Sequence, residues 1–310
     1  MKIKDYISIA RPSHWFKNLF ALPGILFAAF FTNIDLGSFY IQLIIGMISL
    51  CILSSANYVI NEWLDAKYDA FHPTKKHRPA VLGKIRFRYL FIEYILLVIS
   101  GLLLASKISY CFFLTSIIFL LMGAIYNLRP FRTKDKPYLD VLSESVNNPI
   151  RLSLGWFIVI SNPLPPSSLL MGYWMAGAYL MAMKRYAECR TFNNTKVAAT
   201  YRNSFKYYTE EKLLISSFFY AICSAFFLGV FLIKYKIELL LSFPLFSFLF
   251  AWYLKISMEE NSAAQSPEKL FFNRRFIAYI IFMSVTVYYL MSIDIPLLNE
   301  LLNNIFINNF

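Results

Sequence analysis

Charged residues are scarce in this sequence: only 15% of its 310 residues are Asp, Glu, Lys or Arg, whereas 58% are hydrophobic. This composition excludes an ordinary water-soluble globular protein. Cysteine and histidine are scarce as well, with four and three residues. The cysteines lie far apart and without metal-ligand spacing, so the sequence predicts neither a disulfide framework nor a zinc site. No polar linker divides the chain, which predicts a single polytopic domain over residues 1–310.

Long apolar runs are abundant in this chain. Runs of about 18 or more apolar residues are long enough to cross a bilayer as helices, so we expect an all-α integral membrane protein. Nine spans are predicted, with boundaries good to a few residues. They are residues 18–32, 39–60, 88–106, 109–126, 140–161, 168–187, 212–233, 237–256 and 276–293.

The distribution of positive charge predicts the topology. All but four of the 30 lysines and arginines fall in the N-terminal arm and in alternate loops, as the positive-inside rule requires. We therefore expect a cytoplasmic N-terminus, an external C-terminus and a multi-pass location in the cell membrane, the inner membrane in bacteria. Because topology explains the net charge of +12, no nucleic-acid partner is predicted. The cytoplasmic segments are predicted as an interfacial stretch, 1–17, and the loops 57–88, 126–140, 184–211 and 257–275.

An acidic helix end follows the second apolar run. Glu62, Asp65 and Asp69 have the spacing i, i+3, i+7, which places them on one helical face, with Asn57 and Asn61 on its flank. Crowded carboxylates repel one another unless a cation lies among them, and oxygen ligands of this kind suit Mg²⁺. The basic residues that follow, including Lys75 and Arg78, are suited to bind phosphate. The stretch predicts a metal and diphosphate site.

This stretch resembles a motif of a known protein family. Asn61-Glu62-x-x-Asp65-x-x-x-Asp69 resembles the first aspartate-rich signature of the UbiA superfamily of intramembrane prenyltransferases, and Asn57 also matches. Glu62 departs from the usual Asp. The resemblance implies a nine-helix bundle whose first three cytoplasmic loops cap an active site.

Several shorter segments resemble motifs of one branch of this superfamily, the decaprenyl-phosphate phosphoribosyltransferases. The first is Arg11-Pro12-x-x-Trp15-x-Lys17-Asn18, which an aromatic belt with snorkelling cations would also explain. The second is His72-Pro-Thr-Lys-x-x-Arg-Pro79.

The second charged loop and the helix after it supply further candidates. Tyr126 resembles a tyrosine that is common in the superfamily, and Lys134 best matches a nearby lysine that is expected to meet phosphate. Asp140-Val141 with Arg151 resembles another element of this branch. An arginine within an apolar span must face protein, a cavity or an anion. Arg151 is thus either an anion clamp or part of an internal ion pair with Glu144 or Asp140.

The third charged loop lacks the second aspartate-rich motif of prenyl-diphosphate enzymes. It holds Lys184, Arg185 and Glu188, which resemble the K-R-x-x-E of the phosphoribosyltransferase branch. Two cations in place of a metal cage would bind phosphate directly. Positive-inside charge alone would also account for the two cations.

The resemblance implies an Mg²⁺-dependent membrane transferase with diphosphate as leaving group. The donor is either phosphoribosyl diphosphate, acting on a polyprenyl phosphate, or a polyprenyl diphosphate, acting on an aromatic or other acceptor. A transporter is the alternative from another class. Membrane lipid is an expected partner, and the oligomeric state stays open.

The candidate metal ligands are Asn61, Glu62, Asp65 and Asp69. The candidate catalytic residues are Glu62, Asp65, Asp69 and Glu188. The candidate substrate-binding residues are Lys17, Asn57, Asn61, Lys75, Arg78, Tyr126, Lys134, Asp140, Arg151, Lys184 and Arg185.

Overall fold

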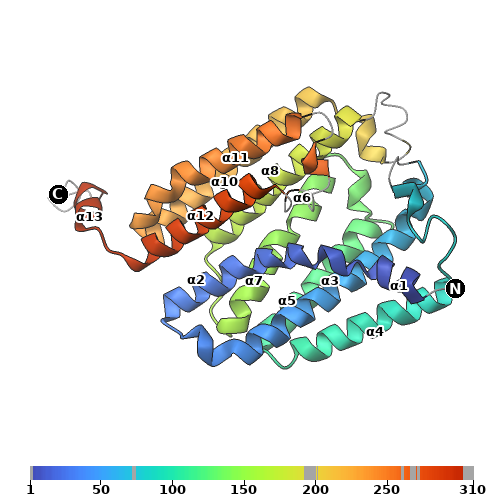
Figure 1. The fold of residues 1–310 in the computed structure, drawn as a ribbon, viewed down its shortest axis with the longest axis horizontal. Coiled ribbons are helices and arrows are strands. Elements are labelled where there is room, and N and C mark those ends of the chain that lie inside the picture. The colour runs from blue at the N-terminus through green and yellow to red at the C-terminus, as the bar shows by residue number, and fades with distance from the viewer. Residues whose placement is uncertain are drawn as a thin grey trace. The chain divides into compact units, whose positions relative to one another are not determined.

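The computed structural model describes residues 3–71, 75–191, 200, 202–259, 262–265, 270 and 273–302. The described part of the chain is helical and contains no β-strand, as expected (Figure 1). Its α-helices are α1 (Ile3–Ala10), α2 (Leu22–Thr32), α3 (Tyr40–Asp69), α4 (Phe87–Ala105), α5 (Tyr110–Asn127), α6 (Leu139–Ser145), α7 (Asn147–Val159), α8 (Ser167–Thr191), α10 (Glu210–Tyr235), α11 (Phe243–Met258), α12 (Arg274–Ser292) and α13 (Pro296–Leu302). Short 3₁₀ segments connect them, among them η1 (Pro12–Ala21), η3 (Lys75–His77), η4 (Thr133–Asp135) and η5 (Asn203–Lys206).

Seven helical segments within the described residues are long and apolar enough to cross a membrane. They begin at Ile3, Gly37, Phe87, Tyr110, Glu210, Ile237 and Arg274. The predicted fifth span is divided into α6 and α7 at Val146, because Pro149 has no N–H to donate to the carbonyl one turn earlier. The predicted sixth span, α8, carries several charged residues near its C-terminus and is not among the seven. The expectation of nine spans therefore stays a prediction.

The chain divides into two compact units. The first comprises Met1–Pro165 and Phe192–Lys212, and the second comprises Pro166–Thr191 and Leu213–Phe310. Helices α1 to α7 belong to the first unit. Helix α8, most of α10 and the helices that follow belong to the second unit. That the chain forms a single domain stays a prediction.

Helix α3 is the central element of the first unit. It packs against α4, α5 and α7 and runs without interruption for 30 residues. At 1.5 Å per residue it is about 45 Å long, which exceeds the hydrocarbon thickness of about 30 Å. The apolar part of the helix ends near residue 60, as predicted, but the helix itself continues to Asp69. The acidic residues after Asn61 therefore share one rigid helix end.

Glycines let α2 and α7 approach each other closely. A Cβ atom added to Gly24 would lie 2.0 Å from the carbonyl oxygen of Leu152, and one added to Gly155 would lie 2.0 Å from that of Ala21. Small residues at such crossings bring helix backbones into direct contact. Around this contact the core of the first unit is apolar, with Leu50, Leu154 and other buried side chains.

The second unit is held by contacts among α8, α10 and α11. Ser224 on α10 donates from Oγ to the carbonyl oxygen of Gly172 on α8 at 3.0 Å. Tyr179 on α8 stacks on Phe250 of α11, with ring centroids 4.5 Å apart, and donates from its hydroxyl to the carbonyl oxygen of Phe250 at 2.6 Å. These polar contacts fix helices whose outer faces are apolar.

Candidate active site

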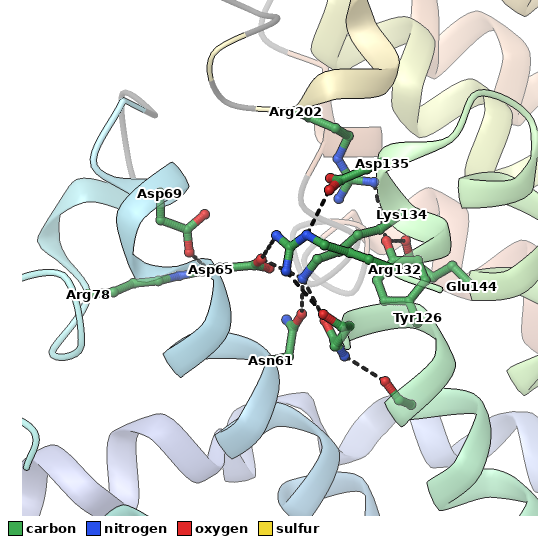
Figure 2. Close-up of polar contacts among 12 residues, drawn as sticks. Asn61, Asp65, Asp69, Arg78, Tyr126, Arg132, Lys134, Asp135, Glu144 and Arg202 are labelled. Atoms are coloured by element: carbon green, nitrogen blue, oxygen red, sulfur yellow. Dashed lines mark hydrogen bonds and ion pairs between the residues drawn. The ribbon is translucent and has the colours of Figure 1, made fainter. Parts of the chain in front are cut away.

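A small pocket lies at the C-terminal end of α3 in the first unit. Its lining is almost entirely charged. Figure 2 shows Asp65 of α3 facing the cations of the loop that contains η4, with Arg202 approaching from the segment before η5. The lining residues are Asp65, Tyr68, Asp69, Arg132, Lys134, Asp135 and Arg202.

Arg132 folds the loop after α5 back toward α3. Its backbone is left-handed, with φ at 32°, and its guanidinium donates to the carbonyl oxygen of Asn127 at 3.1 Å, where α5 ends. The negative end of the helix dipole also stabilises a cation at this place. The same guanidinium donates to Asp135 Oδ2 at 2.7 Å and to Asp65 Oδ1 at 3.2 Å. Arg132 thus joins the end of α5 to the acidic end of α3.

Lys134 is the most deeply buried cation of the pocket, with 3% of its side chain exposed. Its Nζ donates to the Asp65 carboxylate, to Asn127 Oδ1 at 2.6 Å and to Asn61 Oδ1 at 3.3 Å. Burial lowers the pKa of the Lys134 ammonium to about 8, although the Asp65 carboxylate beside it acts in the opposite direction. A poorly hydrated ammonium in this position interacts strongly with any anion that enters the pocket.

Asp69 forms the other acidic wall of the pocket, four residues after Asp65. Its carboxylate is buried and accepts a hydrogen bond from Arg78 Nη1 (Figure 2). Arg78, predicted to bind phosphate, is thus paired with a carboxylate of α3, and its phosphate-binding role stays a prediction. Lys75 lies in η3, outside the pocket lining. His72, Pro73 and Thr74 lie outside the described residues, so this part of the second branch motif stays a prediction.

Glu62 contacts the N-terminal segment. Its Oε2 accepts from Arg11 Nη2 at 2.6 Å and from Arg11 Nε at 3.0 Å, and 2% of the residue is exposed. Its Oε1 is buried and, within the part of the chain that the structure describes, has no hydrogen-bond partner. Glu62 is not among the residues that line the pocket, so its role as a metal ligand stays a prediction.

The other flanking candidates contact protein groups. Asn57 donates to the carbonyl oxygen of Phe119 at 3.3 Å and packs against Gly123, where α3 and α5 touch. The ammonium of Lys17 lies over the ring of Tyr58, 5.9 Å from its centroid. These contacts give both residues a packing role, and their substrate-binding roles stay predictions.

Tyr126 and Asp140 connect the pocket to the neighbouring elements. The Tyr126 hydroxyl donates to Glu144 Oε2 at 2.7 Å and accepts from Arg202 Nη1 at 3.2 Å. Asp140 is fully buried at the start of α6 and accepts from the Tyr208 hydroxyl and from Arg202 Nη1 at 3.4 Å. Both predicted residues therefore contact Arg202, which lines the pocket.

Arg151 lies within α7 and is 8% exposed. Its Nε donates to Asn18 Oδ1 at 3.2 Å, and its guanidinium carbon lies 5.1 Å from the ring centroid of Phe119. The buried arginine therefore faces protein on at least two sides, as burial in an apolar span requires. Both an anion-binding role and an internal ion pair stay predictions.

The candidates of the third charged loop belong to the second unit. They lie near the C-terminal end of α8, where Arg185 Nη1 and Glu188 Oε2 form an ion pair at 2.8 Å. Both side chains are almost completely buried, with 1% and 4% exposed. Lys184 is half-buried on the same helix. The orienting role of Glu188 and the phosphate-binding roles of Lys184 and Arg185 stay predictions.

Four residues that line the pocket were not among the sequence candidates, namely Tyr68, Arg132, Asp135 and Arg202, and neither was Asn127, which accepts a hydrogen bond from Lys134. Arg132 and Asn127 sit beside candidates in the second charged loop, but spacing does not distinguish Arg132 from the exposed Arg129. Arg202 lies in a loop whose charges are explained by topology alone. Only the fold brings it to the pocket.

The pocket places carboxylate oxygens and cationic side chains side by side. Asp65 and Asp69 offer hard oxygen donors of the kind that Mg²⁺ takes, one or two at a site, with phosphate and water completing the shell. The described residues contain no cluster of three or more His, Cys, Asp or Glu side chains placed to hold a metal by themselves. The donor set therefore fits a metal that is held jointly by protein and substrate.

The described residues thus combine helices that are long and apolar enough to cross a membrane with a charged pocket at the end of one of them, α3. The model of the UbiA prenyltransferase family matches residues 18–290. The chain therefore belongs to the UbiA prenyltransferase family, as the sequence motifs indicated, and is a multi-pass protein of the cell membrane.

Curated relatives include two phosphoribosyltransferases. The chain is 28% identical over 217 residues to the decaprenyl-phosphate phosphoribosyltransferase of Mycolicibacterium smegmatis, in an alignment that covers 68% of this chain and 64% of the relative. The match thus spans slightly less than two thirds of that protein. The enzyme of the same name from Mycobacterium tuberculosis is 24% identical over 213 residues, which is 68% of each chain.

Solved structures share the fold. A UbiA homologue from Archaeoglobus fulgidus, bound to GPP and Mg²⁺, aligns with a TM-score of 0.68 and 20% identity over 93% of this chain and 100% of that one. A digeranylgeranylglyceryl phosphate synthase aligns with a TM-score of 0.63 and 15% identity over 91% and 98% of the two chains. The arrangement of helices is therefore that of UbiA proteins.

Proposed function

We propose that this UbiA family transferase moves phosphoribose from phosphoribosyl diphosphate to a polyprenyl phosphate, with Mg²⁺ as cofactor. The observation that carries the proposal is the pocket in which two carboxylates of α3 face three cations, Arg132, Lys134 and Arg202. The choice of donor is supported by the relatives named as phosphoribosyltransferases and by the Lys184, Arg185 and Glu188 motif on α8.

The reaction exchanges one bond at the anomeric carbon. A phosphate oxygen of the lipid attacks C1 of the ribose, and the bond from C1 to diphosphate breaks with its electron pair on the leaving oxygen. The lipid phosphate enters as an anion and needs no strong base. Lys134 and Arg132 bind oxygens of the departing diphosphate, where preorganised positive charge lowers the barrier most.

Asp65 and Asp69 would hold Mg²⁺, with Asn61 on the flank of the same helix end. When bound, the metal would supply positive charge that neutralises the departing diphosphate. Lys75, Arg78, Lys184 and Arg185 remain candidate phosphate ligands. The lipid lies in the membrane-embedded part of a nine-span bundle whose N-terminus and charged loops face the cytoplasm.

Prenyl transfer from a polyprenyl diphosphate to an aromatic acceptor is the second candidate function. The structures of the Archaeoglobus fulgidus homologue with GPP and with DMAPP support it, because both ligands are prenyl diphosphates. The same pocket would bind the same leaving group. The two candidates therefore differ in the donor and in the acceptor.

A label-transfer assay tests the proposal. The purified chain in nanodiscs receives Mg²⁺, a polyprenyl phosphate and phosphoribosyl diphosphate labelled in the ribose. We expect label to enter the lipid fraction with the wild type and with Asp294→Asn, an exposed aspartate in the second unit, but not with Asp65→Asn. Absence of label in the lipid with an otherwise folded wild-type protein would contradict the proposal.

A further inference from the structure

Asp140 anchors the segment before α10 to the start of α6. Its Oδ1 accepts from the Tyr208 hydroxyl, and its Oδ2 accepts from Ser204 Oγ at 3.3 Å. The Tyr208 hydroxyl in turn accepts from the backbone N–H of Tyr138 at 2.7 Å. Asp140, Ser204 and Tyr208 are all buried, as is Phe205, whose ring packs edge-on against that of Tyr208. A buried carboxylate with several donors fixes the position of the segment that supplies them.

The anchored segment begins with Arg202, whose side chain enters the pocket. Arg202 Nη1 donates to Asp140 Oδ2 at 3.4 Å. It also donates to the Tyr126 hydroxyl at 3.2 Å (Figure 2). Only 13% of its side chain is exposed, and it lines the pocket together with Asp65 and Lys134. The guanidinium is a rigid fork of five N–H donors, so contacts at Nη1 fix the direction of the others.

We propose that Arg202 binds a phosphate group of the donor substrate and that Asp140 is the positioning residue that holds Arg202 in place. The inference rests on the proposed function, because it takes the occupant of the pocket to be a diphosphate. A planar arginine fork matches phosphate oxygens in pairs. Asp140 itself is not a phosphate ligand, because it is fully buried and its carboxylate would repel the anion.

Binding of inorganic diphosphate tests the role of Arg202. The full-length chain in nanodiscs is titrated with diphosphate in a calorimeter at a fixed Mg²⁺ concentration. We expect Arg202→Met to weaken binding by about 10- to 100-fold, the effect of removing a charged hydrogen-bond donor, and Arg202→Lys to weaken it less. The matched control is Lys206→Met, an exposed cation of η5 outside the pocket, which should bind as the wild type does.

A double-mutant cycle tests whether Asp140 acts through Arg202. Tyr208→Phe removes the hydroxyl that donates to Asp140, at a site outside the pocket, and should weaken diphosphate binding by about 3- to 10-fold. In an Arg202→Met background the same change should have less than about a twofold effect. Equal effects of Tyr208→Phe in both backgrounds, or unchanged binding by Arg202→Met, would overturn the inference.

The binding measurement is separate from the reaction. A wild type that binds diphosphate through Arg202 but transfers no phosphoribose would refute the proposed function and leave the role of Arg202 intact. A wild type that transfers phosphoribose while Arg202→Met retains full diphosphate affinity would refute the role of Arg202 alone. Failure of the wild type to bind inorganic diphosphate would overturn the inference.

Discussion

Replacing Lys134 by methionine removes the buried ammonium of the pocket and keeps a side chain of similar length. The ammonium donates to Asp65, Asn61 and Asn127, so its loss leaves one partly buried carboxylate and two amide oxygens with fewer partners. Breaking a buried ion pair from one side costs about 3–5 kcal/mol. Arg132 still contacts Asp65 at 3.2 Å. We therefore expect the free energy of unfolding to fall by roughly 3 kcal/mol, near the lower end of this range.

The same change should impair transfer more severely than it impairs folding. Removing one preorganised donor to a developing negative charge costs about 10²- to 10³-fold in rate. Transfer rates and melting temperatures are measured in parallel for the wild type, Lys134→Met and Lys136→Met. Lys136 is an exposed lysine of the same loop, outside the pocket lining, and its replacement should change neither quantity.

A double variant separates stability from chemistry. Asp65→Asn combined with Lys134→Met removes both charges of the pair, so we expect the melting temperature to recover most of the loss. Transfer should stay at the level of the single variants or lower, because both groups act on the substrate and metal. Recovery of transfer together with stability would refute the reasoning, since it would mean that Lys134 serves folding alone.

Three further predictions follow from the ion pairs and the helix packing. Asp69→Asn should raise the Mg²⁺ concentration for half-maximal transfer by about tenfold or more, whereas an unchanged metal titration would show that Asp69 is not a ligand. Arg11→Met should lower the free energy of unfolding by about 3–5 kcal/mol because it removes the partner of the buried Glu62 carboxylate, and adding Glu62→Gln should restore most of it in a melting experiment. Gly155→Ala should lower the melting temperature through a loss of about 1–3 kcal/mol, because the new methyl group meets a backbone carbonyl of η1, and a wild-type melting temperature would contradict this packing.

The acidic face of α3 was predictable because its residues are close in sequence. The spacing of Asp65 and Asp69 places them one helical turn apart, and the structure keeps α3 continuous through both, so both reach the pocket. Glu62 has the same helical phase, but Arg11, 51 positions earlier, binds its carboxylate. Periodicity describes the face of one helix and contains no information about which distant segment covers part of it.

The remaining contributors depend on contacts between distant segments. Arg202 and Asp140 are 62 positions apart, and nothing in the spacing of either indicates the other. The division of the predicted fifth span was, by contrast, readable from Pro149, whose missing N–H interrupts the helix. Local motifs indicated three of the seven lining residues, Asp65, Asp69 and Lys134, whereas the other four and the partners of each residue required the fold.

A direct comparison of donors tests the central claim. The purified chain is given phosphoribosyl diphosphate with a polyprenyl phosphate and, in a parallel reaction, a polyprenyl diphosphate with an aromatic acceptor. The masses of the lipid products are measured by mass spectrometry, and the released diphosphate is quantified. The account predicts a lipid that has gained one phosphoribosyl group for each diphosphate released. This product should be absent with Asp65→Asn. A prenylated aromatic product with no phosphoribosylated lipid would contradict it.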